Sequence, residues 1–477
     1  MSLKKQAITS VKWNFLQQFS IQIINFGVQI ILARLLMPEM FGLIAMISIF
    51  IAIGTMLMDN GMTSSLIRTK NPNQTDYSTV FITNLIISVT VYILIFTLAP
   101  FIADFYNQDV LIDIIRLLSL GIIVRSFVAV HIAKLTKEMN FKLQMKLQIP
   151  SVTIAGITSI TMAYMNYGVW SLVWLNLMQA VIFTIQVWFF TSWRPSLIFN
   201  KECFKSHFKF GYKLTLAGLI DISYNNAYKI IIGKFFSPAQ VGYFNHAETM
   251  RLFPVQQIST VMGKVTYPYF SNIQTNEKLR EVYKIAIRLV LFAVIPTMLI
   301  LITIAKEGFL LIFGNHWLPA VPYFQILALA SIIRPISSYN LNILKVKGRS
   351  DLTLKLEIIK KTIGILAIII GFQFDVIGLV ISLTVVSFIW LLIETYYCGI
   401  LIDYKTTSQI KDTIHLFLIG ATAFIATLYI KTLILDTTDP LLKIFLVSII
   451  YLFLYLILMV IFEKKLLALI IKTLKNK

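Results

Sequence analysis

Long apolar segments occupy most of this chain and restrict what it can fold into. We expect 14 of them, most near the roughly 20 residues that carry an α-helix across a bilayer. Charged residues make up only 13% of the chain, against roughly 25% in soluble domains, so much of its surface has to face lipid. The sequence therefore predicts an all-α, polytopic membrane protein. The expected segments are 12–34, 42–61, 79–103, 110–131, 148–166, 169–190, 212–234, 250–271, 286–305, 320–343, 358–374, 376–398, 412–432 and 442–462.

Two of these segments need comment. The first is too long for the apolar core of a signal peptide and lacks a small-residue cleavage site, so we interpret it as a retained span. Segment 250–271 contains several polar residues. A helix that lies in the membrane interface is the alternative interpretation there.

Basic residues gather in alternate connections between the segments. With the N-terminus in the cytoplasm, 31 of the 42 lysines and arginines lie on the cytoplasmic side and seven at outer ends. Cytoplasmic loops are enriched in Lys and Arg, so both termini are expected in the cytoplasm. This orientation accounts for the net charge of +20 without a nucleic-acid partner. It also places Cys203 and Cys398 on the reducing side, where no disulfide is expected.

The chain repeats itself after about 200 residues. The stretch ARLLMPEMFG at 33–42 matches GKFFSPAQVG at 233–242, and LLSLGIIVRS at 117–126 matches ILALASIIRP at 326–335. In the first pair the proline is expected to end one helix and the glycine to permit a tight turn into the next.

The repeat predicts three parts: an N-terminal lobe at 1–205, a C-terminal lobe at 206–400, and an appended helix pair with a basic cytoplasmic tail at 401–477. Two six-helix lobes of the same orientation are related by an axis along the membrane normal, which is the plan of alternating-access transporters with a cavity between the halves.

Polar residues form one-sided stripes on two equivalent segments. The first segment contains Asn14, Gln18, Gln22, Asn25 and Gln29 at helical spacing, and the seventh contains Asp221, Tyr224, Asn225 and Tyr228 with Lys229 beside them. Hydrogen bonding between helices would explain such stripes. A hydrated cavity is favoured because both stripes are long and occupy equivalent places in the repeat.

Charges inside the segments point to an anionic ligand. Arg125, Lys229, Lys264 and Arg334 outnumber Asp221 and the peripheral Asp59. An intramembrane charge is costly and normally has a partner or a ligand, although snorkelling or a buried ion pair is the alternative for Arg125. Arginine suits phosphate or pyrophosphate, and Tyr, Asn and Gln suit sugar hydroxyls. The candidate substrate-binding residues are Arg125, Arg334, Lys229, Lys264, Asn25, Gln29, Tyr224 and Asn225, with Arg34, Lys234 and Arg251 at the outer mouth; Asp221 and Asp59 are candidates for a coupling ion.

Several catalytic signatures are missing from the sequence. There is no phosphate-binding P-loop motif, no H-E-x-x-H and no cluster of Cys and His. We therefore expect no enzymatic activity, no cofactor and no metal.

The N-terminal half resembles a known family. The patterns LARLLMPEMFGL at 32–43 and DNGMTSSLIR at 59–68, followed by a basic loop ending in MNFK, are similar to Wzx-type polysaccharide flippases of the multidrug/oligosaccharidyl-lipid/polysaccharide exporter superfamily. The resemblance is strongest to the colanic-acid and teichuronic-acid branch.

This resemblance implies fourteen helices and a cationic central cavity in the cytoplasmic membrane of a bacterium. It implies flipping of undecaprenyl-pyrophosphate-linked oligosaccharide repeat units for lipopolysaccharide or exopolysaccharide synthesis, with a polysaccharide polymerase as a candidate partner. Three alternatives stay open: an ion-coupled small-molecule or drug antiporter of the same superfamily, a membrane-embedded glycosyltransferase or polymerase, and a non-transporting scaffold of an assembly complex. Short outer loops speak against the second and the symmetric stripes against the third.

Overall fold

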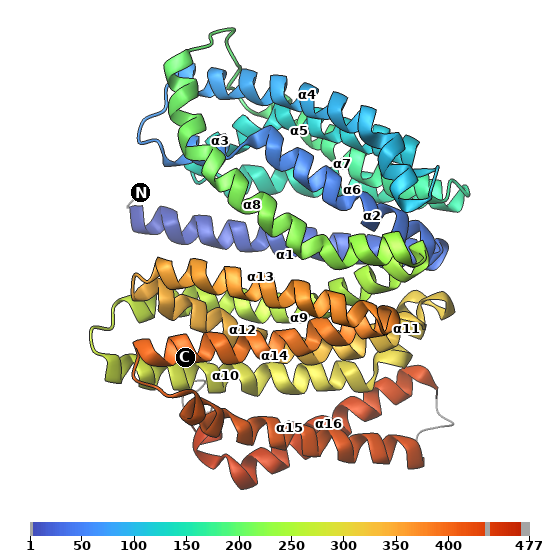
Figure 1. The fold of residues 1–477 in the computed structure, drawn as a ribbon, viewed down its shortest axis with the longest axis vertical. Coiled ribbons are helices and arrows are strands. Elements are labelled where there is room, and N and C mark those ends of the chain that lie inside the picture. The colour runs from blue at the N-terminus through green and yellow to red at the C-terminus, as the bar shows by residue number, and fades with distance from the viewer. Residues whose placement is uncertain (1–2, 435–438, 469–477) are drawn as a thin grey trace. The chain divides into compact units, whose positions relative to one another are not determined.

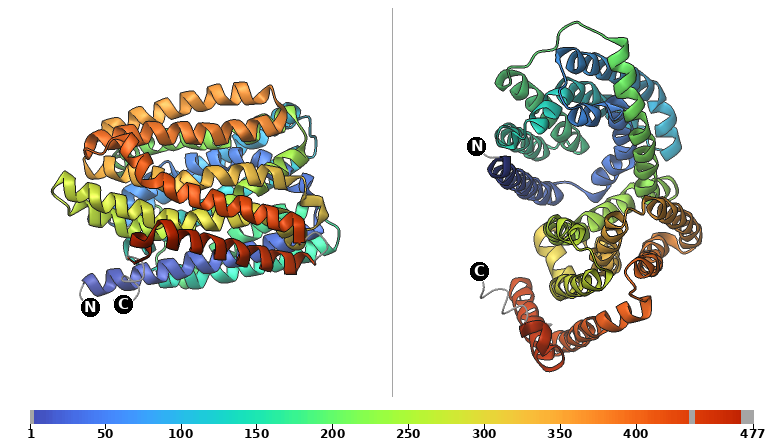
Figure 2. Two further views of the ribbon diagram at one scale, coloured as in Figure 1. Left: turned by 90° about the horizontal axis from the view of Figure 1, so that it is seen from below. Right: turned by 90° about the vertical axis from the view of Figure 1, so that its left-hand side faces the viewer.

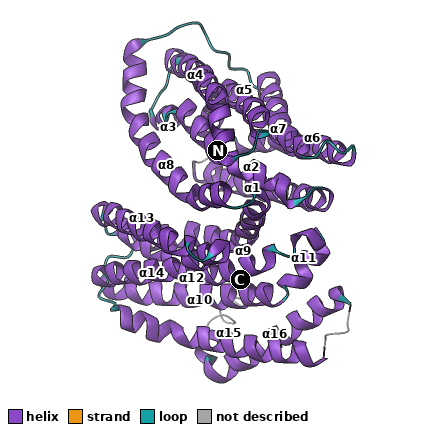
Figure 3. Cartoon of the chain, turned by 45° about the vertical axis from the view of Figure 1, so that its right-hand side comes forward, coloured by secondary structure: helices purple, strands orange, loops and turns teal. Residues whose placement is uncertain are grey.

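The structure is a computed structural model that describes residues 3–434 and 439–468; the side chains at 3–8, 11, 257–265, 267, 268, 350 and 434 lie outside this description. Within the described residues every regular element is a helix (Figure 1, Figure 3). Fourteen long helices in this part of the chain correspond one to one with the predicted segments, so the predicted fold class is confirmed. They are α1 (Leu3–Leu35), α2 (Pro38–Asp59), α4 (Gln74–Tyr106), α5 (Leu111–Lys137), α6 (Phe141–Tyr164), α7 (Val169–Phe190), α8 (Lys201–Phe235), α9 (Pro238–Ser271), α10 (Asn276–Thr303), α12 (Ala320–Val346), α13 (Ser350–Phe372), α14 (Asp375–Leu401), α15 (Thr406–Ile434) and α16 (Pro440–Phe462).

The long helices differ in how apolar they are. Among the described residues, nine are long and apolar enough to cross a membrane by length and composition: α1, α2, α4, α7, α10, α12, α14, α15 and α16. The remaining five, α5, α6, α8, α9 and α13, do not meet this criterion over the described residues. Most of the predicted site residues lie on three of these five, namely α5, α8 and α9.

Helices extend beyond the apolar segments that predicted them. The segment predicted to start at 212 belongs to α8, which begins at Lys201, and the one predicted to start at 250 belongs to α9, which begins at Pro238. Capping residues set these ends, because the first N–H groups of a helix need acceptors. The Asn200 side chain accepts hydrogen bonds from the backbone N–H groups of Glu202 and Cys203, at 2.8 and 3.0 Å. Three short elements, α3 (Met62–Arg68), α11 (Ala305–Phe313) and the 3₁₀ helix η1 (Asn315–Trp317), have no counterpart in the prediction.

The chain divides into two units by packing, Met1–Gly242 and Tyr243–Lys477. In the first unit α4 packs on α5, α1 on α6 and α6 on α7, while α8 lies along α2, α3 and α4 (Figure 2). In the second, α12 and α13 pack on α14, and α10 contacts α12, α15 and α16. Packing partners and sequence repeats are different criteria, so the predicted lobe boundaries at 205 and 400 stay a prediction.

The repeated motifs contact each other in the first unit. Pro38 and Pro238 are each the first residue of a helix, α2 and α9, which confirms their predicted role. The prediction of a turn at the glycine is wrong, because Gly42 and Gly242 lie inside these helices. A Cβ atom on Gly42 would lie 1.7 Å from the Pro238 carbonyl oxygen, and one on Gly242 would lie 2.1 Å from the Pro38 carbonyl oxygen. The glycines therefore allow two helix N-termini to touch backbone to backbone.

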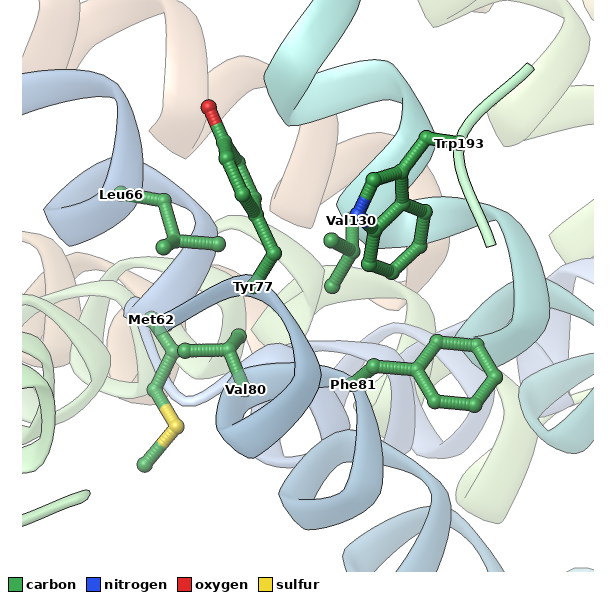
Figure 4. Close-up of a cluster of buried hydrophobic side chains, with 7 residues drawn as sticks. All are labelled: Met62, Leu66, Tyr77, Val80, Phe81, Val130 and Trp193. Atoms are coloured by element: carbon green, nitrogen blue, oxygen red, sulfur yellow. The ribbon is translucent and has the colours of Figure 1, made fainter. Parts of the chain in front are cut away.

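An apolar cluster is buried in the first unit. It consists of the buried side chains drawn in Figure 4: Met62, Leu66, Tyr77, Val80, Phe81, Val130 and Trp193. Trp193 follows α7, and its indole N–H donates to the Gln74 side chain at 2.7 Å, which satisfies its polar atom. The cluster joins α3, α4 and α5.

His207 fastens α8 beside this cluster. Its Nε2 lies 3.3 Å from Asp76 Oδ1 and its Nδ1 lies 2.8 Å from Ser65 Oγ, with only 3% of the histidine exposed. A neutral imidazole that donates from Nε2 to the carboxylate accepts at Nδ1 from the Ser65 hydroxyl. One side chain of α8 is thus bonded to both α3 and α4.

Replacing His207 by alanine is expected to destabilise the protein by about 1–3 kcal/mol, because the buried Ser65 hydroxyl and the Oδ1 atom of Asp76 each lose a hydrogen bond. The thermal unfolding temperature of the detergent-purified protein should fall measurably. The matched control is His316→Ala, since His316 is exposed. Equal unfolding temperatures for both variants would contradict the anchoring role of His207.

Candidate functional site

Two hollows adjoin in the first unit, and Arg125 lines both. The larger hollow, of about 330 Å³, lies among α2, α3, α5, α6 and α7. The smaller hollow, of about 260 Å³, lies among α2, α5 and α7. Arg125 is in the middle of α5, and Thr55 of α2 is the other residue that borders both. The side chain of Arg125 is exposed to this space.

Neutral polar groups surround the guanidinium. The larger hollow adds Thr63, Gln148 and Gln179, and the smaller one adds Ser48 and Asn176. Apolar side chains form the rest of each wall. Such a site offers amides and hydroxyls for sugar hydroxyl groups next to a cation for an anionic group.

Neighbouring helices hold these side chains in place. Gln148 Oε1 accepts a hydrogen bond from Gln17 Nε2 of α1 at 2.7 Å, and Asn176 donates to the carbonyl of Leu172 at 3.0 Å. The Thr55 hydroxyl donates to the carbonyl of Ile51 at 2.8 Å. Ordered side chains lose little freedom when a ligand binds, which favours recognition.

Asp59 supplies the acidic group of the larger hollow. It is the last residue of α2, and its Oδ1 accepts from the backbone N–H of Thr63 at 3.4 Å. Of the predicted site residues, Arg125 and Asp59 are the two that line one hollow together.

Arg125 is a cation without a partner in the described part of the chain. Within the described part of the chain its guanidinium makes no hydrogen bond, ion pair or ring contact to another residue. A charge near the middle of a membrane helix costs on the order of 2.5–3.5 kcal/mol on insertion scales, so such a residue normally has a partner or a ligand. The Arg125 guanidinium is therefore a candidate contact for an anionic group of a ligand.

The polar stripe of α1 faces away from the packed side of the unit, whereas the stripe of α8 is partly packed, because its Tyr228 is buried with only 5% exposed. On α1, Asn25 is exposed and Gln29 half-buried, whereas Val28 and Leu32 are buried in a cluster with residues of α6 and α7. On α8, Asp221 and Asn225 are exposed and Tyr224 and Lys229 half-buried. None of these side chains lines the two hollows described above. Their role in a cavity between the lobes stays a prediction.

The predicted outer cations differ in where they lie along their helices. Arg34 and Lys234 lie in the last turns of α1 and α8, as the repeat predicted, and Lys234 Nζ lies 4.8 Å from the centroid of the Phe105 ring. Arg251 is not at a helix end, because α9 starts at Pro238, twelve residues before the predicted segment.

The second unit holds the remaining candidates. Arg251 of α9 is buried and donates from Nη1 to Ser331 Oγ of α12 at 3.2 Å. Arg334 is exposed, in the middle of α12. Lys264 lies on α9, but its side chain is outside the described residues.

Ser48, Thr55, Gln148, Asn176 and Gln179 are site residues that sequence reasoning missed. A signal existed for the first two, because Ser48, Thr55 and Asp59 are spaced seven and four residues apart on one helix face. The spacing of polar residues thus indicated a polar helix face on the second predicted segment, as it did on the first and the seventh.

Comparison with known proteins shows that the chain is similar to polysaccharide biosynthesis proteins. A family model described as "Polysaccharide biosynthesis protein" matches residues 31–322. The lipopolysaccharide biosynthesis protein WzxC of Escherichia coli K12 is 25% identical over 396 residues, which cover 82% of this chain and 80% of WzxC. The teichuronic acid biosynthesis protein TuaB of Bacillus subtilis 168 is 24% identical, over 74% of this chain and 73% of TuaB. The succinoglycan biosynthesis transport protein ExoT of Rhizobium meliloti 1021 is 22% identical, over 70% and 68% of the two chains.

Solved structures share the fold at low identity. The lipid II flippase MurJ in an inward-closed conformation superposes with a TM-score of 0.78 at 15% identity, covering 95% of this chain and 99% of that chain. An inward-facing multidrug resistance transporter of the MATE family reaches 0.62 at 16% identity, covering 80% and 94%. At these identities the likeness concerns the fold alone.

Proposed function

Because the chain belongs to the polysaccharide biosynthesis protein family, we propose that it is a flippase for undecaprenyl-pyrophosphate-linked oligosaccharide repeat units in surface polysaccharide synthesis. It is a transporter of the membrane rather than an enzyme. The family membership and the relatives WzxC, TuaB and ExoT confirm the resemblance predicted from the sequence.

One observation supports the substrate class most directly. Arg125, whose planar guanidinium has no partner among the described residues, lines two hollows whose polar groups are mainly amides and hydroxyls. Guanidinium groups bind phosphate oxygens through two parallel hydrogen bonds. The nearby Gln148, Gln179 and Asn176 can bond to sugar hydroxyls. A sugar linked to a pyrophosphate needs both kinds of group side by side.

Alternating access would carry the sugar–pyrophosphate head group of the substrate across the membrane. The pyrophosphate and the adjoining sugars bind in the first unit, while the polyprenyl tail stays in lipid. Rocking of the two lobes then opens the site to the outside. Lys229, Lys264 and the stripe residues Asn25, Gln29, Tyr224 and Asn225 would line the path, with Arg34 and Lys234 at its outer end. Asp59 and Asp221 are the proposed sites for a coupling ion.

The proposed setting is the cytoplasmic membrane of a bacterium, with both termini in the cytoplasm. The distribution of basic residues supports this orientation. A polysaccharide polymerase that consumes the flipped unit is the proposed partner.

A drug antiporter of the same superfamily is the second candidate. The fold shared with the MATE transporter supports it. An exporter of cationic drugs needs acidic groups to hold its substrate. The larger hollow holds one such group, Asp59, which already accepts from the Thr63 N–H, whereas the Arg125 guanidinium has no partner among the described residues.

The function is tested in a strain that lacks this protein and the polymerase. The lipid-linked unit is labelled, and its accessibility to an impermeant sugar-modifying reagent is measured on intact cells with and without the plasmid-borne protein. We expect exposure only with the protein. If the unit is equally exposed without it, the flippase assignment is wrong for this substrate, and binding of cationic drugs by the purified protein becomes the next measurement.

A further inference from the structure

A third hollow of the first unit is an apolar groove between α2 and α4. Its volume is about 250 Å³, and each of the residues that line it is apolar. Four lining residues form a row at helical spacing on α4, and between 41% and 70% of each is exposed. They are Leu94, Leu98, Phe101 and Phe105. The groove is therefore open along its α4 side.

Helix α2 separates this groove from the hollows beside Arg125. Phe50 and Ile53 of α2 line the groove, whereas Ser48 and Thr55 line the hollows. With 3.6 residues in each helical turn, the two pairs lie on opposite sides of α2. The groove is thus a separate site from the one around Arg125.

A lysine lies at one end of the groove. The ammonium nitrogen of Lys234, in the last turn of α8, is 4.8 Å from the centroid of the Phe105 ring. In the described part of the chain Lys234 forms no ion pair with a carboxylate. Asp104 precedes Phe105, but the helical spacing places it off the row that lines the groove. The ammonium is therefore available to a phosphate group at this end.

An apolar groove that ends at a cation matches a lipid with an anionic head group. In the orientation proposed above, the C-terminal ends of α4 and α8 lie outside, where the flipped unit emerges. We propose that the groove binds the polyprenyl chain of the flipped unit in the outer leaflet, while a phosphate of its head group contacts Lys234. This inference rests on the proposed function and adds an exit site to it.

The two sites on either side of α2 act in succession. The pyrophosphate and the adjoining sugars bind beside Arg125 first, and the lipid reaches the groove after its head group has crossed. An ammonium binds phosphate as a point charge, without the planar fork of a guanidinium. The exit site therefore holds the phosphate less firmly than Arg125 does, which permits release into the leaflet.

The test is photo-crosslinking of the purified full-length protein in nanodiscs of phosphatidylcholine. The probe is undecaprenyl phosphate with a diazirine on its chain, and mass spectrometry identifies the cross-linked peptides. We expect labelling of α2 and α4 at the groove that undecaprenyl pyrophosphate displaces and the same amount of phosphatidylglycerol does not. Equal displacement by phosphatidylglycerol would indicate a site for anionic phospholipids in general, and would overturn the polyprenyl chain as its occupant.

Leu98→Trp fills the groove from its rim, and we expect most of the labelling there to be lost. Ile93→Trp is the matched control, because Ile93 is an exposed residue of α4 that does not line the groove. Lys234→Gln should raise the probe concentration for half-maximal labelling about tenfold, as expected for one lost charge-assisted hydrogen bond. Lys306→Gln, which removes a charge from an exposed position of α11, should leave that concentration unchanged.

Labelling that avoids the groove, or that is unchanged in Leu98→Trp, would overturn the exit site. The intact-cell assay distinguishes this failure from a failure of the proposed function. If exposure of the lipid-linked unit requires the protein but the groove takes up no probe, the flippase stands and the exit site is wrong. If the groove takes up the probe but exposure does not require the protein, the flippase is wrong and the groove is no exit site for its product.

Discussion

Replacing Arg125 by alanine is expected to lower the exposure of lipid-linked units on intact cells about 100-fold. The loss corresponds to one or two charge-assisted hydrogen bonds of about 1.5–3 kcal/mol each. The measurement is the labelling assay in the strain that lacks the polymerase. Arg125→Lys should retain part of the activity, since lysine keeps the charge but loses the planar fork that binds two oxygens.

The unfolding temperature distinguishes a loss of transport in Arg125→Ala from misfolding of the variant. Arg125 has no partner in the described part of the chain, so its removal breaks no ion pair and should leave the unfolding temperature unchanged or raise it. Arg116 on the same helix is the control, because its guanidinium packs 4.3 Å from the centroid of the Phe96 ring and lines neither hollow. Wild-type exposure in Arg125→Ala, or an equal loss in Arg116→Ala, would remove Arg125 from the substrate path.

The helices were predictable because a single property, apolar length, decides whether a segment can cross a membrane. The ends of the helices were not predictable from apolar length, because capping residues determine where a helix begins. Asn200 caps α8 twelve residues before position 212, where the apolar segment was predicted to start. Because the helix that contains Arg251 was expected to start at residue 250, we predicted Arg251 at the outer mouth. It lies inside α9 instead.

The site was predictable where a charged residue lies in an otherwise apolar segment. Arg125 stands out in an apolar segment, and the structure places it on a hollow. Gln148 and Gln179 look like ordinary polar residues in sequence, because a lone glutamine is common in membrane helices that bond to each other. Only the packing of α6 and α7 around α5 shows that they share a wall with Arg125.

The contact between the repeated motifs leads to the second large effect. Gly42→Ala is expected to destabilise the protein by about 3 kcal/mol, at the upper end of the range for overpacking. The added Cβ would lie 1.7 Å from the carbonyl oxygen of Pro238, and a backbone atom cannot rotate away as a side chain can. The start of α2 must therefore separate from the start of α9. Thermal unfolding of the purified protein measures the cost, and Gly42→Leu should fail to accumulate in the membrane.

Gly308→Ala is the matched control, because nothing lies within 4 Å of a Cβ atom there and alanine favours the helix. Gly242→Ala should resemble Gly42→Ala, since its Cβ would lie 2.1 Å from the Pro38 carbonyl oxygen. The two substitutions separate the same pair of helix ends, so the double variant should cost clearly less than the sum of the single costs. Full additivity would show that the two glycines act at independent contacts, and an unchanged unfolding temperature in Gly42→Ala would show that the helix ends do not touch.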